Sequence, residues 1–245
     1  MKAKGLPRSV AELRARVGKV TMRGGDEVAR ARRMLDVYLE TAATHGLAVE
    51  DVAREIKSGL PALRIGGAEL TAQTDSAPVR LAACAPGCAF CCILAGDEGA
   101  VILEAEARRL HEALVPLAGA PDGRAWHSRA CPALDPETRM CRAYDARPMI
   151  CRTYVSPDAE ACRQISEGTP AAGPGVLGAQ RTYLTVQALG RAGLQGAVTV
   201  PTYALARIAA AAVEGRDLAA ALREARHKPR TLEDERARLT GAATD

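Results

Sequence analysis

Eight cysteines crowd into the middle of this 245-residue chain, and neither end of the chain has any. The first four form a run that reads Cys-x3-Cys-x2-Cys-Cys, which is denser than the scattered burial of small thiols would produce. In a reducing compartment, clustered cysteines indicate metal or redox sites rather than disulfides. Disulfide or redox chemistry and simple packing are the lesser alternatives. The candidate metal ligands are Cys84, Cys88, Cys91, Cys92, Cys131, Cys141, Cys151 and Cys162.

The chain on either side of the cysteines has a helical pattern. Apolar residues recur every three to four positions from Val28 to Ala42, including Tyr38, and again from Leu177 to Leu194. Further helices are expected at about 48–57, after an N-cap at Asp97, after Thr202 and after Asp217. Strand signals are poor. We therefore predict a mostly α protein, a single helical domain with an irregular cysteine-rich metal-binding lobe.

Three regions follow from this pattern. Residues 1–78 are predicted to form a helical N-terminal region with a basic arm, and residues 79–166 the cysteine-cluster metal-binding region. Residues 167–245 are predicted to form C-terminal helices that pack on the same domain. Prolines repeatedly interrupt the middle region, which is typical of a segment whose folding energy comes from a bound metal rather than from apolar burial.

Charge and composition limit the partners. Residues 1–33 hold ten Lys and Arg against three acidic residues, a net charge of +7 that could meet an acidic partner or simply be a solvated helix face. Aromatic residues make up only 3% of the chain, too few for a base-stacking platform, so there is no strong nucleic-acid signal. No apolar run is long enough for a membrane span and no secretory signal is visible, so a cytoplasmic location is predicted. A protein or peptide partner is left open.

Further residues around the later cysteines make the pattern specific. The elements are Cys131-Pro-Ala-Leu134, then Cys141-x2-Tyr144-x2-Arg147-Pro-x2-Cys151-Arg152, then Cys162. Over about residues 80–165 the chain resembles the YkgJ-type cysteine-cluster family, described as zinc- or iron-chelating proteins with a CxxCxxCC motif. The resemblance implies a metal or iron–sulfur site. Flagellin lysine N-methylases are similar in this region, which implies a protein-modifying role for some members. The first spacing here is x3 rather than x2.

The number and type of ligands narrow the choice of metal. Eight thiolates match two four-coordinate sites, and soft ligands favour zinc or iron–sulfur over a hard, oxygen-liganded cation. Structural zinc usually uses two short Cys-x2-Cys pairs, whereas the last four cysteines here are separated by nine or ten residues. An iron–sulfur cluster of the 4Fe-4S type is therefore favoured, and zinc is the alternative.

The first three cysteines also leave an enzyme open. Cys84, Cys88 and Cys91, with Phe90 before the last, match the radical-SAM signature, although the chain lacks the alternating strands and helices of those enzymes. SAM is therefore a further candidate cofactor. The functional alternatives are a non-catalytic metal-binding module with a structural or redox role, a SAM-using enzyme that modifies a protein or peptide, and a zinc-binding adaptor.

Four other side chains are candidates for the surroundings of the metal, and no catalytic residue is assigned. Arg147 and Arg152 flank Cys151, where guanidinium groups could stabilise a negatively charged cluster or bind an anion. Tyr144 could donate a hydrogen bond to sulfur, although packing is the commoner role. His127, four residues before Cys131, is a minor candidate ligand.

Overall fold

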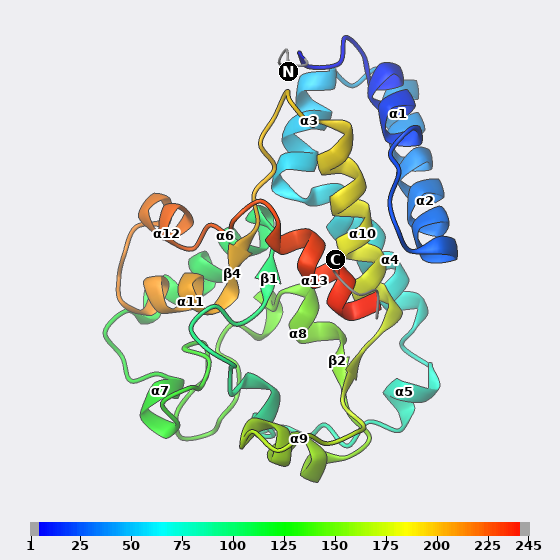
Figure 1. Cartoon of the computed structure of the whole chain (residues 1–245). Helices are drawn as coiled ribbons and strands as arrows, with labels where there is room; N and C mark the ends of the chain where they lie inside the picture. The colour runs from blue at the N-terminus through cyan, green and yellow to red at the C-terminus, as the bar shows by residue number, and fades with distance from the viewer. Residues whose placement is uncertain (1–4, 241–245) are drawn as a thin grey trace. The chain divides into compact units, whose positions relative to one another are not determined.

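A computed structural model describes residues 5–240 (Figure 1), and its mostly helical architecture confirms the predicted fold class. The described chain divides into two compact units. Unit 1 comprises residues 5–72, 178–201 and 229–240, and unit 2 comprises residues 73–177 and 202–228. All eight cysteines lie in unit 2. The predicted regions 1–78, 79–166 and 167–245 stay a prediction.

Unit 1 is built from helices alone. They are α1 (Val10–Gly18), α2 (Gly25–Thr44), α3 (Val49–Ser58), α4 (Leu60–Ala72), α10 (Gly178–Gly193) and α13 (Thr231–Thr240). Helix α10 contacts each of the other five. Its residues are buried on nearly every side, including Tyr183 and Leu184, so α10 is the central element of this unit.

Small residues let neighbouring helices approach α10 closely. A Cβ atom on Gly193 would lie 2.6 Å from Val17 Cγ2, and one on Gly190 would lie 2.8 Å from Ile56 Cγ2. Both distances are shorter than real Cβ contacts, so these positions need glycine although glycine disfavours helix. Polar groups on α10 are also satisfied, since the Gln187 side chain donates to the Ile56 carbonyl at 3.0 Å.

Two details of unit 1 differ from the pattern in the sequence. On α2 it is Leu39 that is fully buried, whereas Tyr38 is half-buried and donates to Glu55 Oε2 at 2.5 Å. Helix α4 begins at Leu60, directly after Gly59, in a segment for which no helix is predicted above. Pro61 is in its first turn, where the missing N–H costs no helical hydrogen bond.

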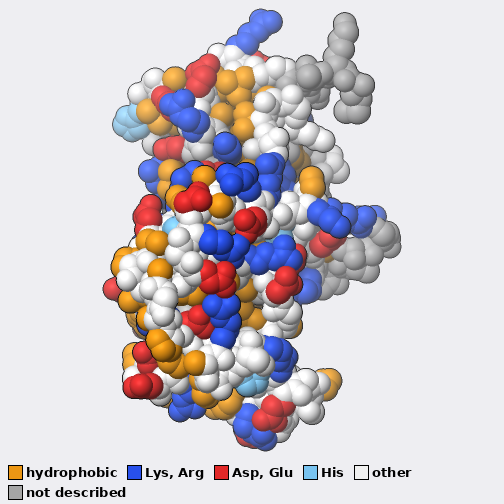
Figure 2. Space-filling view, turned by 90° about the vertical axis from the view of Figure 1, so that its left-hand side faces the viewer, with side chains coloured by type: hydrophobic (Ala, Val, Ile, Leu, Met, Phe, Trp, Pro, Cys, Tyr) orange, Lys and Arg blue, Asp and Glu red, His pale blue; other side chains and the backbone are white. Residues whose placement is uncertain are grey.

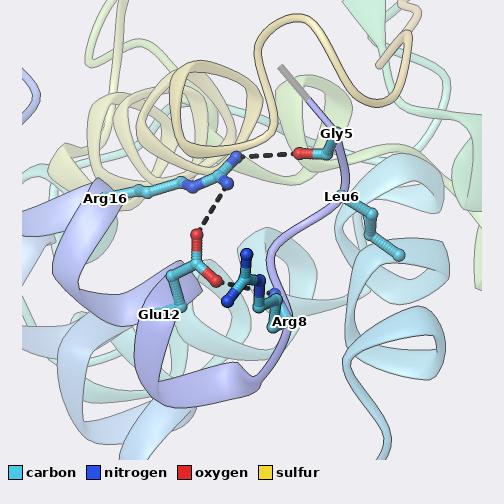
Figure 3. A pocket seen from close by; sticks show the side chains of 5 residues that line it. All are labelled: Gly5, Leu6, Arg8, Glu12 and Arg16. Carbon is cyan, nitrogen blue, oxygen red and sulfur yellow. Dashed lines mark hydrogen bonds and ion pairs between the residues drawn. The ribbon is translucent and has the colours of Figure 1, made fainter.

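Much of the basic N-terminal segment is neutralised within unit 1. The Arg14 guanidinium lies 2.5 Å from Asp36 Oδ1, and Arg32 donates to the Val17 and Val20 carbonyls. A recess of about 360 Å³ lies beside α1. There Arg16 donates to the Gly5 carbonyl at 3.1 Å and to Glu12 Oε1 at 2.7 Å (Figure 3). The predicted arm also includes Lys2 and Lys4, which lie outside the described residues.

Unit 2 combines short helices with two small antiparallel sheets. Its helical elements are α5 (Ala77–Arg80), η1 (Phe90–Cys92), α6 (Glu104–Leu114), η2 (Val115–Leu117), α7 (Gly123–Trp126), η3 (Tyr144–Ala146), α8 (Met149–Thr153), α9 (Ala159–Ser166), α11 (Leu205–Val213) and α12 (Leu218–Glu224). Strand β1 (Val101–Ile102) pairs with β4 (Tyr203–Ala204), and β2 (Tyr154–Val155) pairs with β3 (Gly175–Val176). The apolar faces of α6 and α11 pack together in its core.

Helix α6 begins later than the sequence predicts, so the N-cap assigned to Asp97 is wrong. The N-cap is Leu103, and the residues before it form β1. Leucine has no oxygen with which to cap, but the Glu106 carboxylate accepts the Leu103 N–H at 2.9 Å. Helix α11 likewise takes its N-cap at Ala204 rather than at Thr202. The Asp217 cap of α12 is confirmed, since Asp217 accepts from the Ala220 N–H.

No helix within residues 5–240 is both long enough and apolar enough to cross a membrane.

Candidate metal centre

The eight cysteines come from several short elements and loops of unit 2. Cys84 and Cys88 lie in the loop before η1, and Cys91 and Cys92 are on η1 itself. Cys131 follows α7, Cys141 precedes η3, Cys151 is on α8 and Cys162 is on α9. All eight are free thiols, and only Cys131 and Cys162 are buried.

Backbone hydrogen bonds join the segments that carry Cys92, Cys131 and Cys141. The Cys131 N–H donates to the Cys92 carbonyl at 2.8 Å, and Ile93 forms an antiparallel bridge with Ala130. Leu134, three residues after Cys131, forms a second antiparallel bridge with Cys141. These three cysteines are therefore held in register by irregular backbone pairing.

One buried carboxylate positions the helix that carries Cys151. Glu106 is only 5% exposed, and its Oε1 accepts the Met149 N–H at 2.7 Å while its Oε2 accepts the Leu103 N–H. It thereby caps α6 and α8 together. Within α8, the buried Thr153 hydroxyl donates to the Met149 carbonyl at 2.8 Å. Sequence reasoning missed Glu106, whose one signal is a glutamate in the first turn of an amphipathic helix.

A different set of contacts brings α9 to the first cysteine run. Helix α9 packs on η1, and the Ala83 N–H donates to the Ser156 carbonyl at 2.8 Å. This bond ties the loop of Cys84 to the turn before α9, where Asp158 caps the helix that carries Cys162.

The adjacent thiols of Cys91 and Cys92 on η1 have pKa values that are shifted in opposite directions. The pKa of Cys91 is lowered to about 7, chiefly by a hydrogen bond from the Cys92 thiol and in smaller part by the nearby Arg147 guanidinium. The same hydrogen bond, together with burial, raises the pKa of Cys92 well above its usual value. Cys91 is therefore the thiol of the pair that reaches the thiolate form more readily, and thiolate is the form that binds metal.

The thiols deeper in the unit are held neutral. Burial raises the pKa of Cys131 to about 12 and also raises that of Cys141. The Cys151 side chain keeps exposed surface, yet the protein around its sulfur raises the pKa of the thiol well above its usual range. The sulfurs of Cys131 and Cys141 raise it further, so these thiols are close enough to interact. A bound cation would reverse this preference by stabilising the thiolates.

Cys162 interacts with a different group of sulfurs. Burial raises its pKa, a hydrogen bond with Ser156 opposes this effect, and the thiols of Cys91, Cys88 and Cys84 raise the pKa again. The electrostatic neighbours of Cys162 are therefore the first three cysteines of the run. Cys131, Cys141 and Cys151 are not among the groups that shift the pKa of Cys162 most.

The other predicted side chains lie at varying distances from the thiols. Arg147 stacks on the exposed Tyr144 ring, with its guanidinium carbon 3.6 Å from the ring centre, and it lowers the pKa of both Cys91 and Cys141. Arg152 is exposed. His127 Nδ1 accepts the Arg129 N–H at 3.1 Å, so one of its ring nitrogens is engaged in a turn.

The thiols are neighbours without forming a finished coordination sphere. Within residues 5–240, no three His, Cys, Asp or Glu side chains are grouped as they would be around a metal ion. The donor set nevertheless fits a thiophilic metal, because it consists of eight free thiols gathered in one compact unit. The free energy of binding such a metal would couple to the folding of the surrounding loops.

Comparison with known protein families gives one result, and it falls on this region. Residues 83–168 match the family model CxxCxxCC, "Putative zinc- or iron-chelating domain". The match covers about a third of the chain and contains all eight cysteines. It confirms the predicted resemblance to zinc- or iron-chelating cysteine-cluster proteins. No curated protein and no solved structure matches the chain. The likeness to flagellin lysine N-methylases therefore stays a prediction.

Proposed function

We propose that the CxxCxxCC region of this protein holds two iron–sulfur centres of the 4Fe-4S type with a structural or electron-transferring role. The observation that carries the proposal is that eight free thiols lie within one compact unit. We infer that they divide into two sets of four. An inner set contains Cys92, Cys131, Cys141 and Cys151. An outer set contains Cys84, Cys88, Cys91 and Cys162.

Backbone pairing supports the inner set. Cys92 and Cys131 are joined by a 2.8 Å hydrogen bond, and the Leu134–Cys141 bridge adds the third member. Cys151 belongs with them because its sulfur interacts with those of Cys131 and Cys141. These residues come from four separate segments. Structural zinc sites usually take their ligands from two short Cys-x2-Cys pairs instead.

Packing of α9 on η1 supports the outer set. It brings Cys162 towards the loop that carries the first three cysteines. Three close cysteines with one remote ligand are typical of iron–sulfur clusters. Cys91 interacts with sulfurs of both sets, so the two centres would be neighbours, as electron transfer requires.

Four thiolates around each centre leave no open coordination position, and a closed site is structural or electron-transferring rather than Lewis-acidic. When bound, such a cluster supplies one-electron redox chemistry. The residues of this chain would set its environment. Arg147 places a positive charge near Cys91 and Cys141, where it would stabilise the added negative charge of the reduced state.

Anaerobic purification tests the identity of the metal. We expect a brown protein with matched iron and acid-labile sulfide and with visible charge-transfer absorbance. A colourless protein loaded with zinc would contradict the iron–sulfur proposal and favour the zinc-binding adaptor. SAM is titrated into the reduced protein while the EPR spectrum is recorded. A shift at one unique iron would instead favour a SAM-using enzyme acting on a protein or peptide.

Paired substitutions test the partition. Cys131→Ser and Cys84→Ser should each remove about half of the bound metal, because each disrupts one four-ligand centre. Cys131→Ser combined with Cys151→Ser should lose no more metal than Cys131→Ser alone. Cys131→Ser combined with Cys84→Ser should lose nearly all of it. If a single substitution removed all metal, or if the two doubles behaved alike, the partition would be wrong.

A further inference from the structure

Unit 2 contains a cavity that the cysteines do not line. Its volume is about 550 Å³, and it lies among α11, α12, the segment after η1 and the segment after α7. This volume falls within the range of about 300–1,000 Å³ that is usual for small-molecule sites. Figure 2 views the molecule from the side on which α7, α11 and α12 lie in Figure 1, and basic and acidic side chains alternate on that face.

The charged lining of the cavity is net positive. It contains four arginines, which are Arg124, Arg129, Arg207 and Arg216, against the two acids Asp97 and Glu224. Three of the arginines form ion pairs: Arg124 with Asp122 at 2.8 Å, Arg207 with Asp97 at 2.8 Å, and Arg216 with Glu214 at 3.0 Å and also with Glu224.

Arg129 is the exception among these arginines. Its guanidinium donates to the Ser166 carbonyl at 2.5 Å, and no carboxylate within the described residues pairs with it. The adjacent Ser128 also lines the cavity, and no hydrogen bond of its hydroxyl is found in the described part of the chain. The Arg129 guanidinium therefore has no carboxylate partner within residues 5–240, and the hydroxyl of the adjacent Ser128 is available to donate a hydrogen bond.

The remaining lining is apolar and small. Helices α11 and α12 contribute Ala206, Ala210 and Ala221. The two segments joined by the Ile93–Ala130 bridge contribute Leu94 and Pro132. Alanine leaves room that a larger side chain would fill. The cavity therefore combines an apolar lining for the body of a ligand with guanidinium and hydroxyl donors for a charged group.

We propose that this cavity binds a small organic anion, a carboxylate or phosphate carried on a compact apolar body. Arg129 and Ser128 bind the oxyanion, and the alanine wall contacts the apolar body. Planar guanidinium groups suit both oxyanions because their N–H groups form paired hydrogen bonds with them. None of the eight cysteines lines this cavity.

Calorimetric titration of the purified, metal-loaded full chain tests the proposal. The probes are benzoate, phenyl phosphate, inorganic phosphate and the neutral analogue benzamide. We expect saturable binding of benzoate or phenyl phosphate with a Kd of about 1 mM or tighter, and the tighter of the two identifies the oxyanion. Benzamide should not bind detectably.

Matched variants assign the binding to this cavity. Arg129→Gln should weaken binding at least about tenfold, because it removes a charge-assisted hydrogen bond. Arg109→Gln is the control, since Arg109 is also exposed and also donates to a backbone carbonyl, that of Asp145, but does not line the cavity. Ala210→Leu should weaken binding by filling the space, and circular dichroism verifies that each variant is folded.

The proposal would be overturned by three results: no saturable binding of either organic anion, inorganic phosphate binding as tightly as phenyl phosphate, or equal losses in Arg129→Gln and Arg109→Gln.

Discussion

Replacing Glu106 with alanine should destabilise unit 2. The Glu106 carboxylate accepts two backbone N–H groups, that of Leu103 at 2.9 Å and that of Met149 at 2.7 Å, and only 5% of the residue is exposed. Alanine leaves both donors without their acceptor in a region that water reaches poorly. The start of α8, which carries Cys151, then loses its cap.

The magnitude follows from those two donors. An unsatisfied buried donor costs about 1–3 kcal/mol, so the substitution should lower the free energy of unfolding by about 2–6 kcal/mol. Total stabilities are about 5–15 kcal/mol, so this loss is large enough to unfold a fraction of the protein at moderate temperature. Because Cys151 is two residues beyond Met149, we also expect metal affinity to fall about 10–100-fold, as for other residues that orient ligands.

Urea unfolding followed by tryptophan fluorescence measures the effect on unit 2 directly. Trp126 is the single tryptophan of the chain and lies on α7 in this unit. Glu112→Ala is the control, since Glu112 is an exposed residue of the same helix. Glu106→Gln should be intermediate, because an amide oxygen can replace one acceptor while its NH2 group opposes the second donor.

The reasoning would be refuted if Glu106→Ala unfolded within about 0.5 kcal/mol of the parent protein, the range expected for a surface substitution. A loss equal to that of Glu112→Ala would refute it too. A loss of metal affinity without a loss of stability would show that Glu106 acts on the metal directly and not by capping α8.

Three further predictions concern other parts of the molecule. Gly193→Ala should destabilise unit 1 by about 1–3 kcal/mol because its Cβ would clash with Val17. Gly67→Ala should stabilise unit 1 by about 0.5–1 kcal/mol, because its Cβ would meet open space beside α4. Urea unfolding followed by circular dichroism compares the two variants. Burial acts to raise the pKa of Asp122, but hydrogen bonds from Arg124 outweigh it and leave the pKa lowered. The stability advantage over Asp122→Asn should therefore be complete above the unfolded pKa of about 3.9 and shrink as pH falls below it; an advantage independent of pH would contradict this. Chelation of the metal should lower the free energy of unfolding of unit 2, measured by Trp126 fluorescence, by about 2.7 kcal/mol if the free metal had been at 100 times its Kd. An unchanged free energy of unfolding would show that metal does not stabilise unit 2.

Three helices of unit 1, α2, α3 and α10, were predicted because their apolar periodicity is local, whereas α1, α4 and α13 were not predicted. The stripe from Val28 to Ala42 corresponds to the buried face of α2, and Asp217 caps α12 as expected. The errors arose where a tertiary contact replaced a local signal. Asp97 has the side chain of a good N-cap, but Leu103 holds that position because Glu106 supplies the oxygen.

The region of the candidate site was predictable from the sequence, but the arrangement of its residues was not. The cysteine spacing identified the region, because clustered cysteines indicate a metal or redox site rather than packing. The neighbours of Cys162 could not be inferred, because they depend on α9 packing on η1. The arginine-lined cavity left no signal in the sequence either, since Arg129 and Arg216 are far apart in the chain and are joined only by the fold.

The central place of α10 in unit 1 has a consequence for how the chain is made. Helices α1 to α4 are complete once residue 72 has been synthesised, but the helix that covers their apolar faces ends only at Gly193. At roughly 5–20 residues per second, this interval lasts about 6–24 s on the ribosome. Every cysteine emerges during that interval. The metal-binding segment is thus exposed to the metal supply of the cell while the first helices still await their partner, and the order of translation favours loading the metal before unit 1 closes.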